Sequence, residues 1–185
     1  MKTVYSFYIW LTLLVTIIIT IAFKANNNAF PEKIEWNTHF NAKPDDYSHY
    51  AALTATTWQY SYITKIRNNQ LNIDFKFVGG VDPNKSWVKR NRIKNKEISN
   101  QLLNHEQGHV YINFLLLKEG ELRIRNQNYT INNYKKLIQL TANKISKQYS
   151  DMQSRYYNET KPGSDLVAQR QWDDYLKKQL DSYEK

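Results

Sequence analysis

The chain has 185 residues and a formal net charge of +9, enough length for one domain with a hydrophobic core. It contains no cysteine, which excludes disulfides, thiolate metal sites and lipidated cysteines. The basic residues are scattered except for a dense run at residues 89–96, which no nucleic-acid-binding motif accompanies. We therefore interpret that run as a solvated loop and expect no nucleic-acid partner.

Residues 5–23 contain no Asp, Glu, Lys or Arg. As a helix this segment would span about 28 Å, close to the thickness of the hydrocarbon layer of a bilayer. We predict that residues 1–25 form a transmembrane anchor, which we favour over a cleaved signal segment, and that residues 26–33 form a linker. The domain at residues 34–185 would then be held at the membrane on its periplasmic or extracellular side, or secreted if residues 1–25 are cleaved.

The first part of the domain is predicted to form a small antiparallel sheet. Residues 51–63 are rich in Thr, Trp and Tyr, and residues 71–77 alternate between apolar and polar side chains, so both read as strands. Gly79 and Gly80, with the turn sequence at residues 82–84, end the second strand in this prediction. Residues 86–88 form a short third extended piece.

Three helices are predicted after the basic run. The first covers residues 96–123, the second starts at Tyr134 and is stopped by Lys-Pro-Gly at residues 161–163, and the third covers residues 164–183. Glu159 continues the apolar stripe of the second helix, and a carboxylate there needs a charged partner or a metal. The stripe of the first helix consists of Ile98, Leu102, His105, His109, Ile112 and Leu116, and that of the second of Tyr134, Ile138, Thr141, Ile145, Tyr149, Met152 and Tyr156.

Residues 105–109 read His-Glu-Gln-Gly-His, and they hold two of the four histidines of the chain. On a helix, His105 and His109 lie on the same face, so both imidazoles can bind one ion, with Glu106 placed to take a proton from a water. Imidazole with carboxylate suits Zn²⁺, which predicts a zinc-dependent hydrolase. Gly108 indicates close approach by a strand or a substrate. Two helix histidines near a solvated glutamate are the alternative.

A catalytic zinc site needs a third protein ligand. Leu115 stands where the extended form of the motif has a third histidine, so we predict that Glu159 is the third ligand. The remaining alternatives are a surface role for Glu159, ligation by Glu119 or Glu121, and the loop histidines His39 and His49. Tyr156 and Tyr157 are candidates for a hydrogen bond to a developing oxyanion, with packing on the core as the alternative.

The string Leu-Leu-Asn-His-Glu-Gln-Gly-His at residues 102–109, with Tyr-Asn-Glu-Thr at residues 157–160 and Trp172, resembles a bacterial family of uncharacterised domains described as predicted secreted zinc-dependent proteases. The resemblance covers residues 34–180 and implies a zincin-like protease. The pattern of that family has Asp where this chain has Asn158, His where it has Pro162, and Phe where it has Val110. If the Asp or the His is the third ligand of the family, the zinc site here is incomplete, whereas Glu159 as the ligand would keep it complete.

We therefore predict an α+β, zincin-like fold: an N-terminal transmembrane helix, a small antiparallel sheet and three helices. The expected function is a membrane-anchored zinc peptidase with a peptide or protein substrate, in which His105, His109 and Glu159 bind Zn²⁺ and Glu106 is the general base. The alternative is a catalytically degenerate binding module that keeps the fold. Oligomeric state and substrate preference are left open by the sequence.

Overall fold

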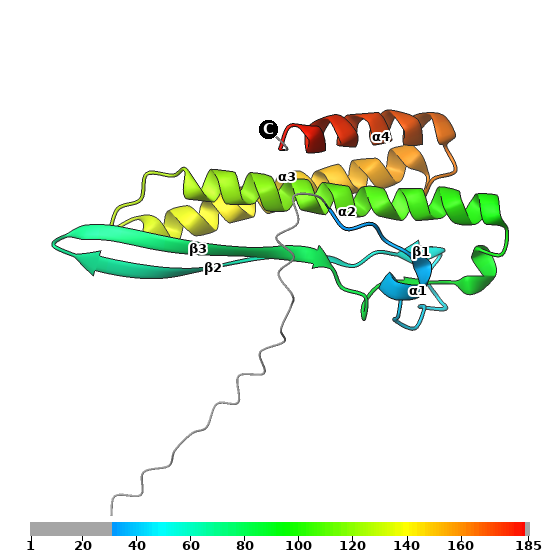
Figure 1. The fold of residues 1–185 in the computed structure, drawn as a ribbon, viewed down its shortest axis with the longest axis horizontal. Coiled ribbons are helices and arrows are strands. Elements are labelled where there is room, and N and C mark those ends of the chain that lie inside the picture. Colours follow the sequence, from blue (N-terminus) through cyan, green and yellow to red (C-terminus); the bar gives the residue numbers. More distant parts are fainter. Residues whose placement is uncertain (1–30, 184–185) are drawn as a thin grey trace, which may run out of the picture.

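A computed structural model of the chain describes residues 31–183, which have an α+β fold. Three long helices lie over a long two-stranded β-ribbon, and a short strand pair with a one-turn helix lies at one end (Figure 1). The ribbon consists of β2 (Thr56–Arg67) and β3 (Gln70–Val81), and the short pair of β1 (Ala52–Leu53) and β4 (Trp87–Val88). The coarse prediction of a small antiparallel sheet followed by three helices is confirmed.

The central helix, α2 (Lys96–Arg125), contacts both β-pairs and the two following helices. Asn95 caps its start by accepting a hydrogen bond from the Ile98 backbone N–H at 3.0 Å. The predicted stripe is buried along most of the helix, but its first member, Ile98, is 52% exposed. The prediction fails there because Ser99 is the residue that faces α1 (Trp36–His39), where it accepts a hydrogen bond from the Trp36 indole at 3.0 Å.

Helices α3 (Tyr134–Thr160) and α4 (Leu166–Asp181) pack on α2 and on each other. As predicted, α3 stops at the Lys-Pro-Gly sequence, where Lys161 adopts a left-handed conformation with φ 48°. The Asp165 carboxylate caps α4 by accepting a hydrogen bond from the Ala168 backbone N–H at 3.1 Å. The core that joins the three helices includes Ile112, Leu116, Ile145, Tyr149, Tyr156, Trp172 and Leu176.

The strand predicted at residues 51–63 is divided between β1 and β2 by Thr54 and Ala55. β1 pairs with β4, whereas β2 pairs with β3 over twelve residues, so residues 31–183 contain two sheets of two strands instead of one. Gly79 and Gly80 lie inside β3, not at its end, because the chain continues in register opposite Trp58 and Thr57. A Cβ on Gly79 would lie 2.9 Å from the Thr57 carbonyl, so a larger residue does not fit.

Among residues 31–183, no helix has both the length and the apolar character needed to cross a membrane. The predicted anchor at residues 1–25, and residues 26–30 of the predicted linker, lie outside the described residues.

Candidate metal centre

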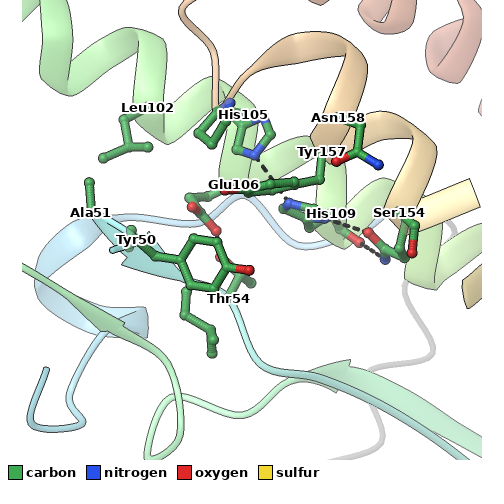
Figure 2. A pocket seen from close by; sticks show the side chains of 14 residues that line it. Tyr50, Ala51, Thr54, Leu102, His105, Glu106, His109, Ser154, Tyr157 and Asn158 are labelled. Atoms are coloured by element: carbon green, nitrogen blue, oxygen red, sulfur yellow. Dashed lines mark hydrogen bonds between the residues drawn. The ribbon is translucent and has the colours of Figure 1, made fainter. Parts of the chain in front are cut away.

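Helix α2 carries His105, Glu106 and His109 to the wall of a cavity of about 450 Å³. The opposite wall is the extended segment at residues 50–54, which includes β1, and the last turns of α3 form a third side (Figure 2). The predicted helical motif therefore lies at a cavity, and not on an isolated surface.

The two histidine rings meet edge to face at this cavity. Their Nε2 atoms are 3.2 Å apart, and the ring planes are inclined by 88°. Two nitrogens that bind one tetrahedral Zn²⁺ at about 2.0–2.1 Å lie roughly 3.3–3.4 Å from each other. The separation thus fits two ligands of one ion.

The hydrogen bonds of Thr160 fix the proton of His105. The Thr160 hydroxyl donates its only proton to the Tyr156 carbonyl at 2.7 Å, and it lies 2.9 Å from His105 Nδ1. It must therefore accept a hydrogen bond from Nδ1–H, which leaves a lone pair on His105 Nε2.

Gln153 fixes the proton of His109 in the same way. Its amide nitrogen donates to the His109 carbonyl at 3.0 Å, so its amide oxygen faces His109 Nδ1, with which it forms a hydrogen bond. An amide oxygen only accepts, so His109 donates from Nδ1–H, and in the neutral imidazole the lone pair is then on Nε2.

Two lone pairs therefore converge on the same space. His105 is only 1% exposed, and burial, followed by the neighbouring His109, lowers its pKa to about 3. A neutral pair with both protons on Nδ1 cannot form an Nε2–H···Nε2 hydrogen bond, whereas a cation bound by both nitrogens satisfies both lone pairs. The donor set therefore fits a metal ion.

Tyr156 holds the two rings from α3. Its ring stacks on His105 with centroids 4.8 Å apart, and its hydroxyl donates to the His105 carbonyl at 2.8 Å. A Cβ on Gly108 would lie 2.1 Å from that hydroxyl oxygen. Gly108 thus allows close approach, as predicted, but by a side chain of α3 and not by a strand or a substrate.

Behind Tyr156, helix α4 supplies a second layer of hydrogen bonds. The buried Gln169 amide nitrogen donates to the Tyr156 hydroxyl at 2.9 Å and to the Asp173 carboxylate at 2.8 Å. The other oxygen of Asp173 accepts from the Asn104 amide at 2.9 Å. This chain fixes the orientation of Tyr156, and α4 therefore supports the histidines without lining the cavity.

Glu106 lines the cavity and is only 3% exposed. The Thr54 hydroxyl donates to its carboxylate at 2.6 Å. Burial raises the pKa of Glu106, while His109 and the hydrogen bonds from Thr54 act in the opposite direction. A buried carboxyl of this kind suits a group that takes up and releases a proton.

Glu159 does not lie where the stripe of α3 predicts it. Its side chain is 50% exposed, accepts a hydrogen bond from the Trp172 indole at 2.7 Å and pairs with Arg155 at 3.4 Å. Thr160, four residues after Tyr156, takes the buried position instead. The turn of the helix thus directs Glu159 toward α4 and away from the histidines, and it does not line the cavity.

The other carboxylates considered as third ligands are held by arginines. Glu119 pairs with Arg123 at 2.5 Å, and Glu121 pairs with Arg125 at 2.9 Å, within α2 itself. His39 pairs with Glu32 at 3.2 Å, and the rings of His49 and Tyr50 are 4.1 Å apart. Within residues 31–183, no three His, Asp or Glu side chains form a group that could hold a metal ion.

Several residues that support the site are not predicted by the sequence. Thr160 and Gln153 hold the imidazole protons, and Thr54 holds Glu106. The apolar spacing of α3 could have indicated Thr160, because residues three and four positions after Tyr156 both lie on the same helix face as Tyr156. Thr54 has no local signal, since only the tertiary fold brings it to α2.

Tyr156 and Tyr157, the two candidates for a hydrogen bond to an oxyanion, lie in different environments. Tyr156 is fully buried, with its hydroxyl engaged by the His105 carbonyl and Gln169. Tyr157 lines the cavity, and its ring meets that of Tyr50 edge to face at 5.3 Å. Tyr157 is therefore the one placed to contact a bound molecule.

Comparison of the chain with family models, curated proteins and solved structures found no match.

Proposed function

We propose that this protein is a zinc-dependent peptide hydrolase in which His105 and His109 bind the metal and Glu106 is the general base. The observation that supports the proposal is the 3.2 Å distance between the Nε2 atoms of the two histidines, whose rings are each held by a hydrogen bond at Nδ1. When bound, Zn²⁺ would supply a Lewis acid that polarises a carbonyl group and lowers the pKa of a water molecule.

The chain's own groups supply the remaining chemistry. Glu106 is adjacent to His105 in sequence, and burial raises its pKa, which makes its carboxylate a stronger proton acceptor than an exposed glutamate. The hydroxyl of Thr54 holds that carboxylate at the cavity. Tyr157 offers a phenol to a developing negative charge on the substrate.

A peptide is the substrate class that the cavity wall favours. β1 pairs only with β4 among the described strands, and the segment around it, residues 50–54, lines the cavity. An extended peptide can lie along such a strand and exchange backbone hydrogen bonds with it. Attachment to the membrane through residues 1–25, which would place the domain outside the cytoplasm, is part of the same proposal.

A second function, a metal-binding module without catalysis, is favoured by the donor set. Besides the two histidines, the cavity is lined by neutral oxygen donors on α3, those of Ser154, Tyr157 and Asn158. A neutral third donor binds Zn²⁺ more weakly than a carboxylate or an imidazole does. A zinc site of low affinity could then serve recognition instead of hydrolysis.

One experiment separates the two functions. The full-length chain and its Glu106→Gln variant are loaded with zinc, the bound zinc is measured, and both are incubated with a peptide library. Hydrolysis predicts equal zinc in both proteins and cleavage by the wild type alone. Equal zinc with no cleavage by either protein favours the binding module, and no zinc in either contradicts both functions.

A further inference from the structure

The two sides of the cavity differ in polarity. Figure 2 shows Ala51, Leu102 and Tyr50 on one side of the histidine pair, and Ser154 and Asn158 on the other side, beyond His109. The first group comes from the β1 segment and α2, whereas the second comes from α3. A molecule lying across the histidines therefore meets aliphatic and aromatic side chains on one side and amide and hydroxyl groups on the other.

The carbon-lined side has the composition of a side-chain subsite. Leu102 is only 6% exposed and belongs to the buried core behind the wall, so the wall is backed by packed residues. The Tyr50 and Tyr157 rings, 5.3 Å apart and inclined by 84°, border it, and Pro162 also lines the cavity. Burial of an apolar side chain against this wall is favourable, whereas a charged side chain would find no hydrogen-bonding or ionic partner there.

The few charged residues at the cavity also favour an uncharged side chain. Among the described residues that line the cavity, Glu106 is the only carboxylate, and there is no Lys or Arg. The Glu106 carboxylate is 3% exposed, and one of its oxygens accepts a hydrogen bond from Thr54. On the side of Tyr50, Ala51 and Leu102, a lysine or glutamate side chain of a peptide would therefore lose its hydration without gaining an ion pair.

We propose that the cavity binds a peptide with a bulky apolar side chain on the side of Tyr50, Ala51 and Leu102, and an uncharged small or polar side chain on the side of Ser154 and Asn158. This inference rests on the proposed peptide hydrolase and specifies its substrate class. Tyr50, Ala51 and Leu102 act as specificity-determining residues for the apolar side chain.

Binding is measured separately from cleavage. Zinc-loaded and metal-free Glu106→Gln protein is titrated by calorimetry with peptides that differ at one position, which is Phe, Leu, Ala, Lys or Glu. We expect peptides with Phe or Leu at the favoured position to bind about tenfold or more tightly than the peptide with Ala, since one methylene group in an apolar pocket changes affinity roughly 10- to 200-fold. The peptides with Lys or Glu at that position should bind most weakly.

Two variants, one on each wall, test the assignment of the sides. Ala51→Leu should fill the apolar side and remove the preference for Phe over Ala. Ser154→Arg, at an exposed position of α3, should leave that preference unchanged and make an acidic residue at the other peptide position bind better by about tenfold.

The outcomes distinguish the inference from the function on which it rests. A preference for apolar peptides that Ala51→Leu removes supports the subsite, even if the wild type cleaves none of them and the hydrolase proposal fails. Equal binding of all the peptides, a preference for charged side chains, or a preference lost in Ser154→Arg but kept in Ala51→Leu would overturn the subsite.

Discussion

Substitution of Thr160 tests whether the position of the His105 imidazole proton controls metal binding. Thr160→Val keeps the shape of the side chain but removes the oxygen that accepts from His105 Nδ1–H at 2.9 Å. The His105 proton can then move to Nε2 and be donated to His109 Nε2, which is 3.2 Å away. The variant should therefore convert two converging lone pairs into an ordinary hydrogen bond.

The expected loss of metal affinity follows from that bond. In Thr160→Val, the hydrogen bond between the two Nε2 atoms must break before a metal can bind, which costs about 0.5–1.5 kcal/mol. The proton then returns to His105 Nδ1, where it is a buried donor without a partner, and this costs roughly 1–3 kcal/mol more. Partial relaxation reduces the sum, so we expect zinc to bind about 10- to 100-fold more weakly, the range observed when a supporting partner of a ligand is removed. The lost bond to the Tyr156 carbonyl should also lower the free energy of unfolding by about 1 kcal/mol.

The assay combines zinc titration against a competing chelator with NMR of the imidazole nitrogens in the metal-free protein. Wild type and Thr160→Ser, which keeps the hydroxyl, should bind zinc equally well and show the His105 proton on Nδ1. Thr160→Val should bind more weakly and show the proton on Nε2. If Thr160→Val keeps both the wild-type affinity and the Nδ1 proton, the role assigned to Thr160 is wrong.

Four further variants test other parts of the structure. Glu159→Gln should leave zinc affinity within about twofold of wild type, because Glu159 pairs with Arg155 at 3.4 Å at the surface, and a tenfold loss in a zinc titration would make it a ligand after all. Gly108→Ala should destabilise the fold by about 1–3 kcal/mol or more in urea unfolding, since its Cβ would lie 2.1 Å from the Tyr156 hydroxyl oxygen; an unchanged midpoint would contradict this packing. Burial raises the pKa of Glu106, so its carboxyl destabilises the metal-free fold increasingly as pH rises above 4.5, the pKa of this carboxyl in the unfolded chain. The Glu106→Gln variant should therefore gain more unfolding free energy over wild type at about pH 7 than at about pH 4. An equal gain at both pH values would refute this reasoning. Asn158→Asp adds a carboxylate to the cavity wall and should tighten zinc binding by about tenfold, and unchanged affinity would show that residue 158 does not reach the metal.

Helical periodicity predicted the common face of the two histidines, but on α3 it placed Glu159 at the buried position that Thr160 takes. His105 and His109 are four residues apart on a long helix, so their common face follows from the pitch. After Tyr156, a step of three selects Glu159 and a step of four selects Thr160, and periodicity permits both. The structure selects Thr160 because the exposed Glu159 carboxylate finds partners in Trp172 and Arg155.

The strands were predicted only in part, since β3 continues through Gly79 and Gly80 and the break between β1 and β2 was not predicted. Residues 51–63 read as one strand because β propensity continues across Thr54 and Ala55. At the break, Thr54 donates a hydrogen bond to Glu106, 52 residues later in the chain, and the Ala55 backbone N–H donates to Ser86, contacts that no local pattern contains. Contacts of this range, and the hydrogen bonds that set the imidazole protons, are properties of the packed fold and not of a short stretch of sequence.

The central claim is that His105 and His109 bind one metal ion through Nε2. X-ray absorption at the zinc edge, measured on the zinc-loaded full-length chain and on a His105→Gln/His109→Gln variant, tests it directly. We predict two imidazole nitrogens at about 2.0–2.1 Å from zinc in the wild type and loss of that zinc in the double variant. Zinc bound without imidazole ligands, or bound equally well by the double variant, would contradict the claim.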